Sequence, residues 1–284
     1  DDLAGTVFVA GGTQTSGAEW QYAVIGYSES TGSYIGSNIS GGSGVGIDQV
    51  NDIITDNFGN IYLTGGVINL TTGLDCRTIK LDSTLSVVWY STFNGEDDLD
   101  DVANSITIDD SGYVYITGYS TSTNESKAYV TIKYDPSGQE KWVIHYNGSN
   151  SQDDEATAIL LDEDRNIIVT GSCFNGSDQD YVTVKYSNDG SILWGINYNH
   201  SYGGNDKANA IALDNQNNII VTGQCQSGSS TLQYVTVKYA QLTHDLIIQY
   251  DTLDNPLYPK NELIIRFDPT LINTAAIDNK AKRF

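Results

Sequence analysis

Four aspartates recur at intervals of 53, 53 and 52 residues and are the first side chains to consider for chemistry: Asp48, Asp101, Asp154 and Asp206. A ring of carboxylates would suit a cation such as Ca²⁺, which takes several oxygen ligands, or the hydroxyls of a sugar. Aspartate also accepts backbone N–H groups and fixes loops. Recurrence in every complete copy favours this structural role, because one binding site rarely needs the same residue at every position. Ligand binding stays the alternative.

Two acidic loops and a second set of aspartates raise the same question. The loops Glu96–Asp101 and Gln152–Glu155 resemble loose calcium loops, but neither has the ligand spacing of an EF-hand. Solvated charge is the commoner reason for such runs. A turn aspartate is expected at the end of each of four apolar runs: Asp56, Asp109, Asp162 and Asp214. The sequence therefore requires no cofactor, and Ca²⁺ is the one ion that it leaves open.

Lysine and tryptophan recur in the same way. The repeated lysines are Lys80, Lys133, Lys185 and Lys238. A half-buried lysine among so many carboxylates predicts an ion pair between neighbouring copies, with the stem packed on tyrosine. Nine residues after the first three of these lysines stand Trp89, Trp142 and Trp194. We expect them to be core wedges rather than sugar platforms.

The sequence offers few other sets of residues that could form a catalytic site. The three histidines His145, His200 and His244 lie in different surroundings, and no nucleophile elbow, zinc-protease helix or phosphate loop occurs. The sequence therefore disfavours a Ser-His-Asp enzyme, whereas paired carboxylates for glycoside hydrolysis stay open. The three cysteines are predicted to be small buried thiols with no disulfide, since equivalent positions in neighbouring copies are too far apart for a bridge.

The charge of the chain restricts its partners. Its 284 residues hold 36 Asp and Glu against 14 Lys and Arg, a net charge of −22, which repels nucleic acid and anionic membranes. No run is long and apolar enough for membrane insertion. The chain has no Met, so we expect the native protein to have lost a leader or a longer N-terminal region. A protein or a glycan at the cell surface, or further domains of an assembly, are the expected partners.

An internal repeat positions these residues. A glycine that follows a short β-rich run recurs at intervals of 54, 53, 53 and 52 residues: Gly11, Gly65, Gly118, Gly171 and Gly223. A second run follows each glycine, as in Tyr129–Tyr134, and a third precedes it, as in Ala103–Asp109. With the segment around each tryptophan, one unit is predicted to be four short strands joined by turns.

The first turn of the unit calls for a residue with positive φ. Gly59 and Gly112 supply it in two copies. Arg165 and Asn217 stand at the same place in the next two copies, and asparagine tolerates the left-handed region better than arginine.

A four-stranded antiparallel unit cannot bury both faces alone, so its copies must stack, and radial stacking gives a β-propeller. The pattern Asp-x-Ala-x-x-Ile-x-x-Asp, then Tyr-Ile-Thr-Gly, Tyr-Val-Thr-Ile-Lys-Tyr and Gly-x-x-x-Trp, as in Asp101 to Trp142, resembles the SBBP family of β-propeller repeats. The resemblance implies a secreted or surface-exposed bacterial protein, often a large one, without common catalytic residues. We expect an all-β propeller of five four-stranded blades.

The predicted boundaries follow the repeat. The propeller is expected over residues 1–239, with blades at about 1–47, 48–100, 101–153, 154–205 and 206–239. The first blade lacks its opening strand, and Asp245–Tyr250 or residues upstream of Asp1 are the expected sources of a closing strand. Residues 240–284 are expected to be this strand and a linker to a further domain, with a strand-like run at Asn261–Phe267.

The functional expectation is a non-enzymatic module for recognition, adhesion or scaffolding, because no unique catalytic set stands out. The first alternative is a carbohydrate-active hydrolase or a glycan-binding lectin with carboxylates at the channel mouth. The second alternative is a propeller stabilised by Ca²⁺.

Overall fold

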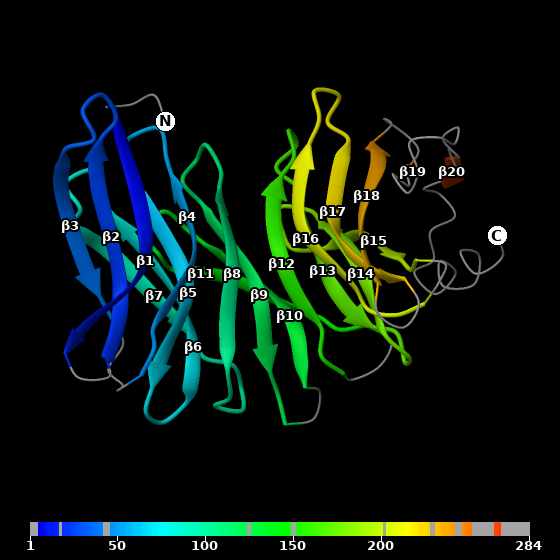
Figure 1. The fold of residues 1–284 in the computed structure, drawn as a ribbon, viewed down its shortest axis with the longest axis horizontal. Helices are drawn as coiled ribbons and strands as arrows, with labels where there is room; N and C mark the ends of the chain where they lie inside the picture. Colours follow the sequence, from blue (N-terminus) through cyan, green and yellow to red (C-terminus); the bar gives the residue numbers. More distant parts are fainter. Residues whose placement is uncertain are drawn as a thin grey trace. The chain divides into compact units, whose positions relative to one another are not determined.

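A computed structural model describes residues 5–16, 19–41, 46–123, 126–148, 152–200, 203–227, 231–241, 246–251 and 264–267. Every element in these ranges is a β-strand, and the strands form five antiparallel sheets (Figure 1). Each sheet is one blade of a β-propeller. The predicted all-β propeller fold and its five blades are thereby confirmed.

The sheets follow the chain in order. The first has three strands, β1 (Thr6–Ser16), β2 (Glu19–Ser28) and β3 (Tyr34–Ser40). The second is β4 (Gln49–Thr55), β5 (Ile61–Asn69), β6 (Gly73–Leu81) and β7 (Val87–Phe93). The third is β8 (Asp101–Ile108), β9 (Val114–Thr121), β10 (Lys127–Tyr134) and β11 (Glu140–Tyr146).

The remaining sheets have the same plan. The fourth is β12 (Glu155–Leu161), β13 (Ile167–Phe174), β14 (Gln179–Tyr186) and β15 (Ile192–Tyr198). The fifth is β16 (Asp206–Leu213), β17 (Ile219–Ser227), β18 (Thr231–Gln241), β19 (Leu246–Asp251) and β20 (Ile264–Phe267). The run predicted at Asp245–Tyr250 thus overlaps β19, which pairs with β18. Residues 252–263 and 268–284 of the predicted linker lie outside the described residues.

The chain forms two compact units, Asp1–Ile159 and Leu160–Phe284. In the first unit, Tyr22 and Val24 of the first blade pack against Ile61 and Leu63 of the second. Tyr62 of the second blade in turn belongs to a core built mainly from the third. In the second unit, the fourth and fifth blades share a core through Ile168, Tyr181, Val221 and Tyr239. Apolar faces of consecutive blades therefore build the core of each unit.

The repeat glycines are required by a bulge in the opening strand. In the second blade the register shifts between Val50 and Asp52, opposite Gly65. A Cβ at Gly65 would lie 1.8 Å from the carbonyl oxygen of Gln49, and the corresponding distances at Gly118 and Gly223 are 1.9 and 2.0 Å. No side chain fits at such a distance, so only glycine lets the bulged strand pair there. Gly171 occupies the same place in β13, opposite Val182 of β14.

The predicted turn chemistry is present in four blades. Each turn aspartate accepts two backbone N–H groups, those of the second and fourth residues after it, in the turns that begin at Asp56, Asp109, Asp162 and Asp214. The fourth residue of each turn has positive φ, between 61° and 81°, in Gly59, Gly112, Arg165 and Asn217. The aspartate carboxylate thus accepts hydrogen bonds from N–H groups that have no backbone acceptor in the tight turn.

The repeated lysines pair inside a blade rather than between blades. Lys185 Nζ lies 2.7 Å from Asp162 Oδ2, and both residues belong to the fourth blade. Lys238 makes the same 2.7 Å contact with Asp214 in the fifth blade. The expected pairing between neighbouring copies is therefore wrong, because the first turn of a blade bends its aspartate back over the third strand. Lys80 and Lys133 lie over tyrosine rings, those of Tyr62 and of Tyr113 and Tyr115.

Two of the tryptophans reach the next blade. Trp89 of β7 packs against Tyr134 of β10, with ring centroids 6.4 Å apart, and its indole N–H donates to the carbonyl oxygen of Pro136. Trp194 of β15 contacts Tyr239 of β18 at 6.4 Å. Trp142 packs within its own blade, against Tyr115 at 6.3 Å. All three cysteines, Cys76, Cys173 and Cys225, are buried free thiols.

Candidate functional site

The four repeated aspartates are buried and hold the loops that enter each blade. Asp101, Asp154 and Asp206 each accept a hydrogen bond from the backbone N–H six residues earlier, at Gly95, Gly148 and His200. Asp48 accepts the N–H of Ile68 at 2.9 Å. Three of the carboxylates thus hold the backbone of the loop that enters their own blade, and Asp48 holds the backbone of β5 in its blade. Binding of a cation or a sugar by these four residues stays a prediction.

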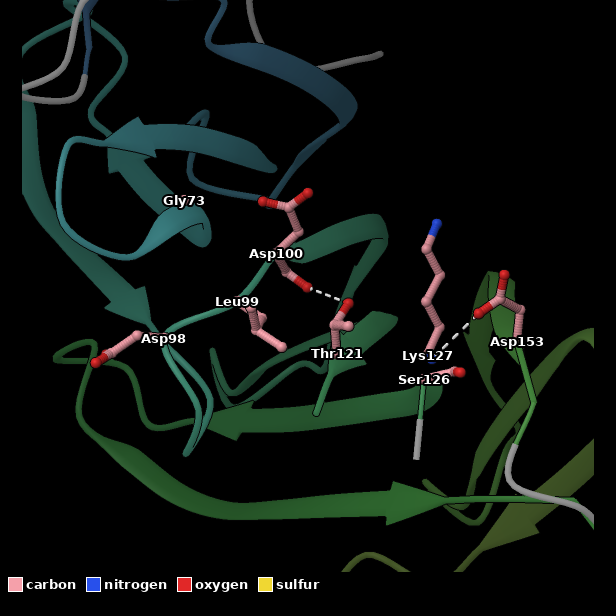
Figure 2. A pocket seen from close by; sticks show the side chains of 8 residues that line it. All are labelled: Gly73, Asp98, Leu99, Asp100, Thr121, Ser126, Lys127 and Asp153. Atoms are coloured by element: carbon pink, nitrogen blue, oxygen red, sulfur yellow. Dashed lines mark hydrogen bonds between the residues drawn. The ribbon is translucent and has the colours of Figure 1, made fainter. Parts of the chain in front are cut away.

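A pocket in the first unit collects a different set of residues. It has a volume of about 380 Å³ and is lined by eight residues, Gly73, Asp98, Leu99, Asp100, Thr121, Ser126, Lys127 and Asp153 (Figure 2). Its carboxylates come from the two acidic loops that the sequence singled out, Glu96–Asp101 and Gln152–Glu155. The structure therefore brings these two loops to one site, which their separation in sequence does not suggest.

Residues that break the repeat are concentrated in this pocket. The loops equivalent to that of Asp98 carry Val45, Ser151 and Gly203 at its position. The residues equivalent to Lys127 in the other four blades are Trp20, Leu74, Gln179 and Leu232. Asp98 is therefore the one acid among these four loops, and Lys127 is the one cation among the five blades. Lys127 could have been identified in the sequence by its departure from the repeat, but it is not one of the recurring residues.

The backbone of the pocket is also unusual. Five residues other than glycine have positive φ in the described ranges, and three of them, Leu85, Arg165 and Asn217, lie in hairpin turns where other blades have glycine. The other two, Asp98 at 53° and Ser126 at 40°, line the pocket. Left-handed backbone at non-glycine residues costs energy and is concentrated at functional sites.

The carboxylates of the pocket are anchored but open to solvent. Asp98, Asp100 and Asp153 are all exposed. Asp98 Oδ1 accepts from Asn94 Nδ2 at 2.7 Å, and Asp100 Oδ1 accepts from the N–H of Leu74 at 3.0 Å. Figure 2 shows Asp100, Lys127 and Asp153 extending to the same side, whereas Asp98 points away from them. Asp100, Lys127 and Asp153 thus share one side of the pocket lining.

Lys127 lines the pocket and packs over Tyr119, which lies behind it and is not a lining residue. The Lys127 ammonium lies 3.8 Å from the centre of the Tyr119 ring, and its backbone N–H donates to Asp153 Oδ1 at 3.4 Å. Burial raises the pKa of Tyr119 to about 12, and the negative charges of Asp100 and Glu155 add to the effect. Tyr119 is therefore a neutral donor at physiological pH. The pocket offers carboxylates, hydroxyls and one ammonium group, all of which can bind the hydroxyl groups of a sugar.

Two absences among the described residues bear on the predictions of a metal site and of membrane insertion. No group of three or more His, Cys, Asp or Glu side chains in the described ranges is arranged to hold a metal ion. Within the same residues, the structure contains no helix with the length and apolarity needed to cross a membrane.

Comparison with known families supports the fold first. The family model described as SBBP, beta-propeller repeat, matches residues 96–124. The resemblance to SBBP repeats is thereby confirmed, and the chain carries a repeat of this type. The match begins in the loop that supplies Asp98 and Asp100. No curated protein sequence matches the chain.

Solved structures extend the comparison to the whole propeller. An ulvan lyase, titled as a new family of polysaccharide lyase PL25, matches with a TM-score of 0.50 at 12% identity, over 93% of this chain and 82% of that chain. This likeness shows a shared fold. A GH43 endo-arabinanase from Bacillus licheniformis matches with a TM-score of 0.36 at 16% identity, over 75% of this chain and 91% of that one. Regucalcin from Agrobacterium tumefaciens, titled a calcium-binding protein, matches with a TM-score of 0.39 at 11% identity, over 78% and 70% of the two chains.

The match to the ulvan lyase corrects the functional expectation. A non-enzymatic module for recognition, adhesion or scaffolding was the main expectation, and the propeller fold is shared with a polysaccharide lyase, which is a carbohydrate-active enzyme. This match favours the glycan-active alternative. The expectation was based on the lack of a unique catalytic set, whereas the pocket contains Asp98 and Lys127, which do not recur in the repeat. The pocket shows that residues found in one blade alone have to be weighed separately.

Proposed function

We propose that the protein is a carbohydrate-active enzyme of the cell surface or extracellular space that binds a polysaccharide in the pocket of the first unit and hydrolyses it. The observation that carries the proposal is the gathering of Asp98, Asp100, Lys127 and Asp153 around one cavity, with the unrepeated Asp98 and Lys127 among them. Solvent-exposed carboxylates beside hydroxyls can bind the hydroxyl groups of a sugar chain.

The charge of the protein favours a neutral glycan. The pocket has three carboxylates against one ammonium group, and the chain has a net charge of −22. Sulfated or uronate-containing chains would be repelled by this field. Cleavage by elimination starts from a uronate, whereas hydrolysis needs only two carboxyl groups that flank the glycosidic bond. Hydrolysis of a neutral polysaccharide is therefore the reaction that suits the site.

The carboxylates have separate roles in this proposal. Asp100 and Asp153 extend to one side of the pocket and serve as the acid and base pair. Lys127 donates hydrogen bonds to sugar hydroxyls. Asp98, held by Asn94, binds the sugar chain at the other side of the opening. Positioning of the substrate and proton transfer by these groups would each lower the barrier.

The test is a screen of the whole chain against neutral and anionic polysaccharides, with release of reducing ends as the measurement. We expect turnover on a neutral polysaccharide, and a fall of about 100-fold or more in kcat for Asp100→Asn and Asp153→Asn. Lys127→Ala should mainly raise KM. Asp110→Asn is the matched control, because Asp110 is an exposed aspartate in a hairpin turn and does not line the pocket.

The proposal fails if folded protein shows no turnover on any chain tested, or if Asp100→Asn and Asp153→Asn act as fast as the Asp110→Asn control. Preference for an anionic chain would contradict the assignment of a neutral substrate.

A further inference from the structure

The tyrosine beneath Lys127 departs from the repeat just as Lys127 does. Tyr119 directly follows the repeat glycine of the third blade. The residues at this place in the other four blades are Gly12, Gly66, Ser172 and Gln224. An aromatic ring at this place and a cation at the place of Lys127 therefore occur together in one blade, and in that blade alone.

The pairing of β9 with β10 brings the two side chains together. Tyr119 of β9 stands directly opposite Tyr129 of β10, and Lys127 comes two residues before Tyr129. Side chains two residues apart on a strand share a face, so Lys127 is the diagonal neighbour of Tyr119 on that face. The 3.8 Å contact between the Lys127 ammonium and the ring centre follows from this register.

The ammonium lies on the ring although carboxylates are close to it. Three carboxylates line the same pocket. Asp153 is within reach of Lys127, because its Oδ1 accepts the backbone N–H of that residue at 3.4 Å. In the described ranges, however, no ion pair joins Lys127 to a carboxylate. A cation–π contact and a surface ion pair have similar strengths, so a ring in the right place is enough to direct the ammonium.

We propose that Tyr119 is a positioning residue that holds the Lys127 ammonium away from the pocket carboxylates, where it stays available to a sugar hydroxyl. An ammonium paired with Asp153 would have fewer N–H groups for the sugar and would occupy an oxygen that the proposed reaction needs. The negative face of the ring attracts the ammonium, so the hydroxyl of Tyr119 is not required. This inference rests on the proposed function, because it concerns the substrate of the same pocket.

The first measurement locates Lys127 in the whole chain without any substrate. The ring of Tyr119 should shift the NMR signals of the Lys127 ε-methylene group upfield, and their loss in Lys127→Ala assigns them. We expect the shift to persist in Tyr119→Phe, which keeps the ring, and to vanish in Tyr119→Leu. A shift that is absent from the unmodified chain, or that Tyr119→Leu leaves in place, would overturn the proposal.

The second measurement is a double-mutant cycle on KM for the polysaccharide that the chain cleaves. Tyr119→Leu should raise KM by about threefold with little change in kcat, whereas Tyr119→Phe should keep the KM of the unmodified chain. In the Lys127→Ala background Tyr119→Leu should have no further effect, because it acts through Lys127.

The matched control is a second tyrosine that lies under a lysine outside the pocket. The Lys133 ammonium is 4.7 Å from the centre of the Tyr113 ring, and neither residue lines the pocket. Tyr113→Leu should leave KM unchanged. Circular dichroism checks that each variant is folded.

Additive effects of Tyr119→Leu and Lys127→Ala on KM would overturn the proposal, because the ring would then act independently of the ammonium. An equal rise of KM in Tyr113→Leu or in Tyr119→Phe would overturn it as well. If the unmodified chain cleaves no polysaccharide, the proposed function fails, whereas an absent ring shift or an additive cycle overturns this inference alone.

Discussion

Neighbouring aspartates in the same two loops have opposite surroundings. Asp101 and Asp154 are completely buried, and each accepts a backbone N–H from its own loop. Asp100 and Asp153, one residue earlier in each case, are exposed and line the pocket. Alternation along an extended backbone sends consecutive side chains to opposite sides. One residue of register thus separates an aspartate that holds the fold from one that faces a ligand.

This contrast shows why residue type alone is a poor guide to function in a repeat protein. Burial raises the pKa of Asp101, against hydrogen bonds from Ser120 and Gly95 that lower it. The Asp101 carboxylate therefore has a structural role in its blade. The exposed aspartates keep oxygens available for a sugar, and their variants should change activity while leaving stability nearly intact.

The largest effect on stability is expected where a buried carboxylate has a buried cation. Lys185→Met leaves the Asp162 carboxylate, which is 0% exposed, without its ammonium partner at 2.7 Å. We expect the free energy of unfolding to fall by about 3 kcal/mol. Lys141→Met is the control, because Lys141 is 48% exposed and 4.0 Å from Asp135, and it should cost less than about 0.5 kcal/mol. Urea unfolding followed by tryptophan fluorescence measures both, and equal losses would contradict the distinction.

The direct test of the contrast compares two adjacent alanine substitutions. Asp154→Ala removes the acceptor of the Gly148 N–H inside the fold, and we expect a loss of about 2 kcal/mol in the free energy of unfolding. Asp153→Ala should change that free energy by less than about 0.5 kcal/mol while abolishing turnover. If Asp153→Ala destabilised the protein as much as Asp154→Ala, the pocket aspartate would be structural too.

A pH effect is expected from a third buried carboxylate. Burial raises the pKa of Asp180 to about 6 against a hydrogen bond from Asn175, and the charges of Asp178 and Asp206 add to the rise. The folded chain then holds this proton more tightly than the unfolded chain, so stability falls as pH rises from about 4 through 6. Asp180→Asn should therefore raise the Tm by about 3 °C at pH 8 and by less at pH 4. The same shift at both pH values would show that the charge of Asp180 is not the cause.

The smallest effect is expected from calcium. The repeated carboxylates already accept backbone N–H groups, so Ca²⁺ has few oxygens to bind there. We expect the Tm to move by less than about 1 °C between excess Ca²⁺ and a chelator. A larger rise with Ca²⁺ would support the calcium-stabilised propeller instead, and its loss in Asp153→Ala or in Asp154→Ala would show which aspartate of the loop binds the ion.

Much of the architecture was predictable from the sequence because it is local and repeated. Asp56 and its equivalents mark turns through hydrogen bonds that span four residues, and Arg165 and Asn217 were recognised as positions for positive φ. The ion pair of Lys185 was expected between neighbouring blades, since sequence does not show that the turn aspartate Asp162 reaches the third strand of its own blade. The pocket was missed for a related reason. Its two loops are about one blade apart in sequence, and Lys127 has no counterpart that would have drawn attention to it.

The sequence by itself determined the unit, its turns and the stacking of its copies, because glycine, aspartate and alternating apolar residues act through contacts within about 50 residues. Only the tertiary structure decided what each aspartate does. Asp100 and Asp101 are the same residue type in the same loop, and their roles differ because the pleat turns one toward solvent and buries the other against the N–H of Gly95. The bulge that makes Gly118 indispensable is likewise a property of paired strands, not of either strand alone.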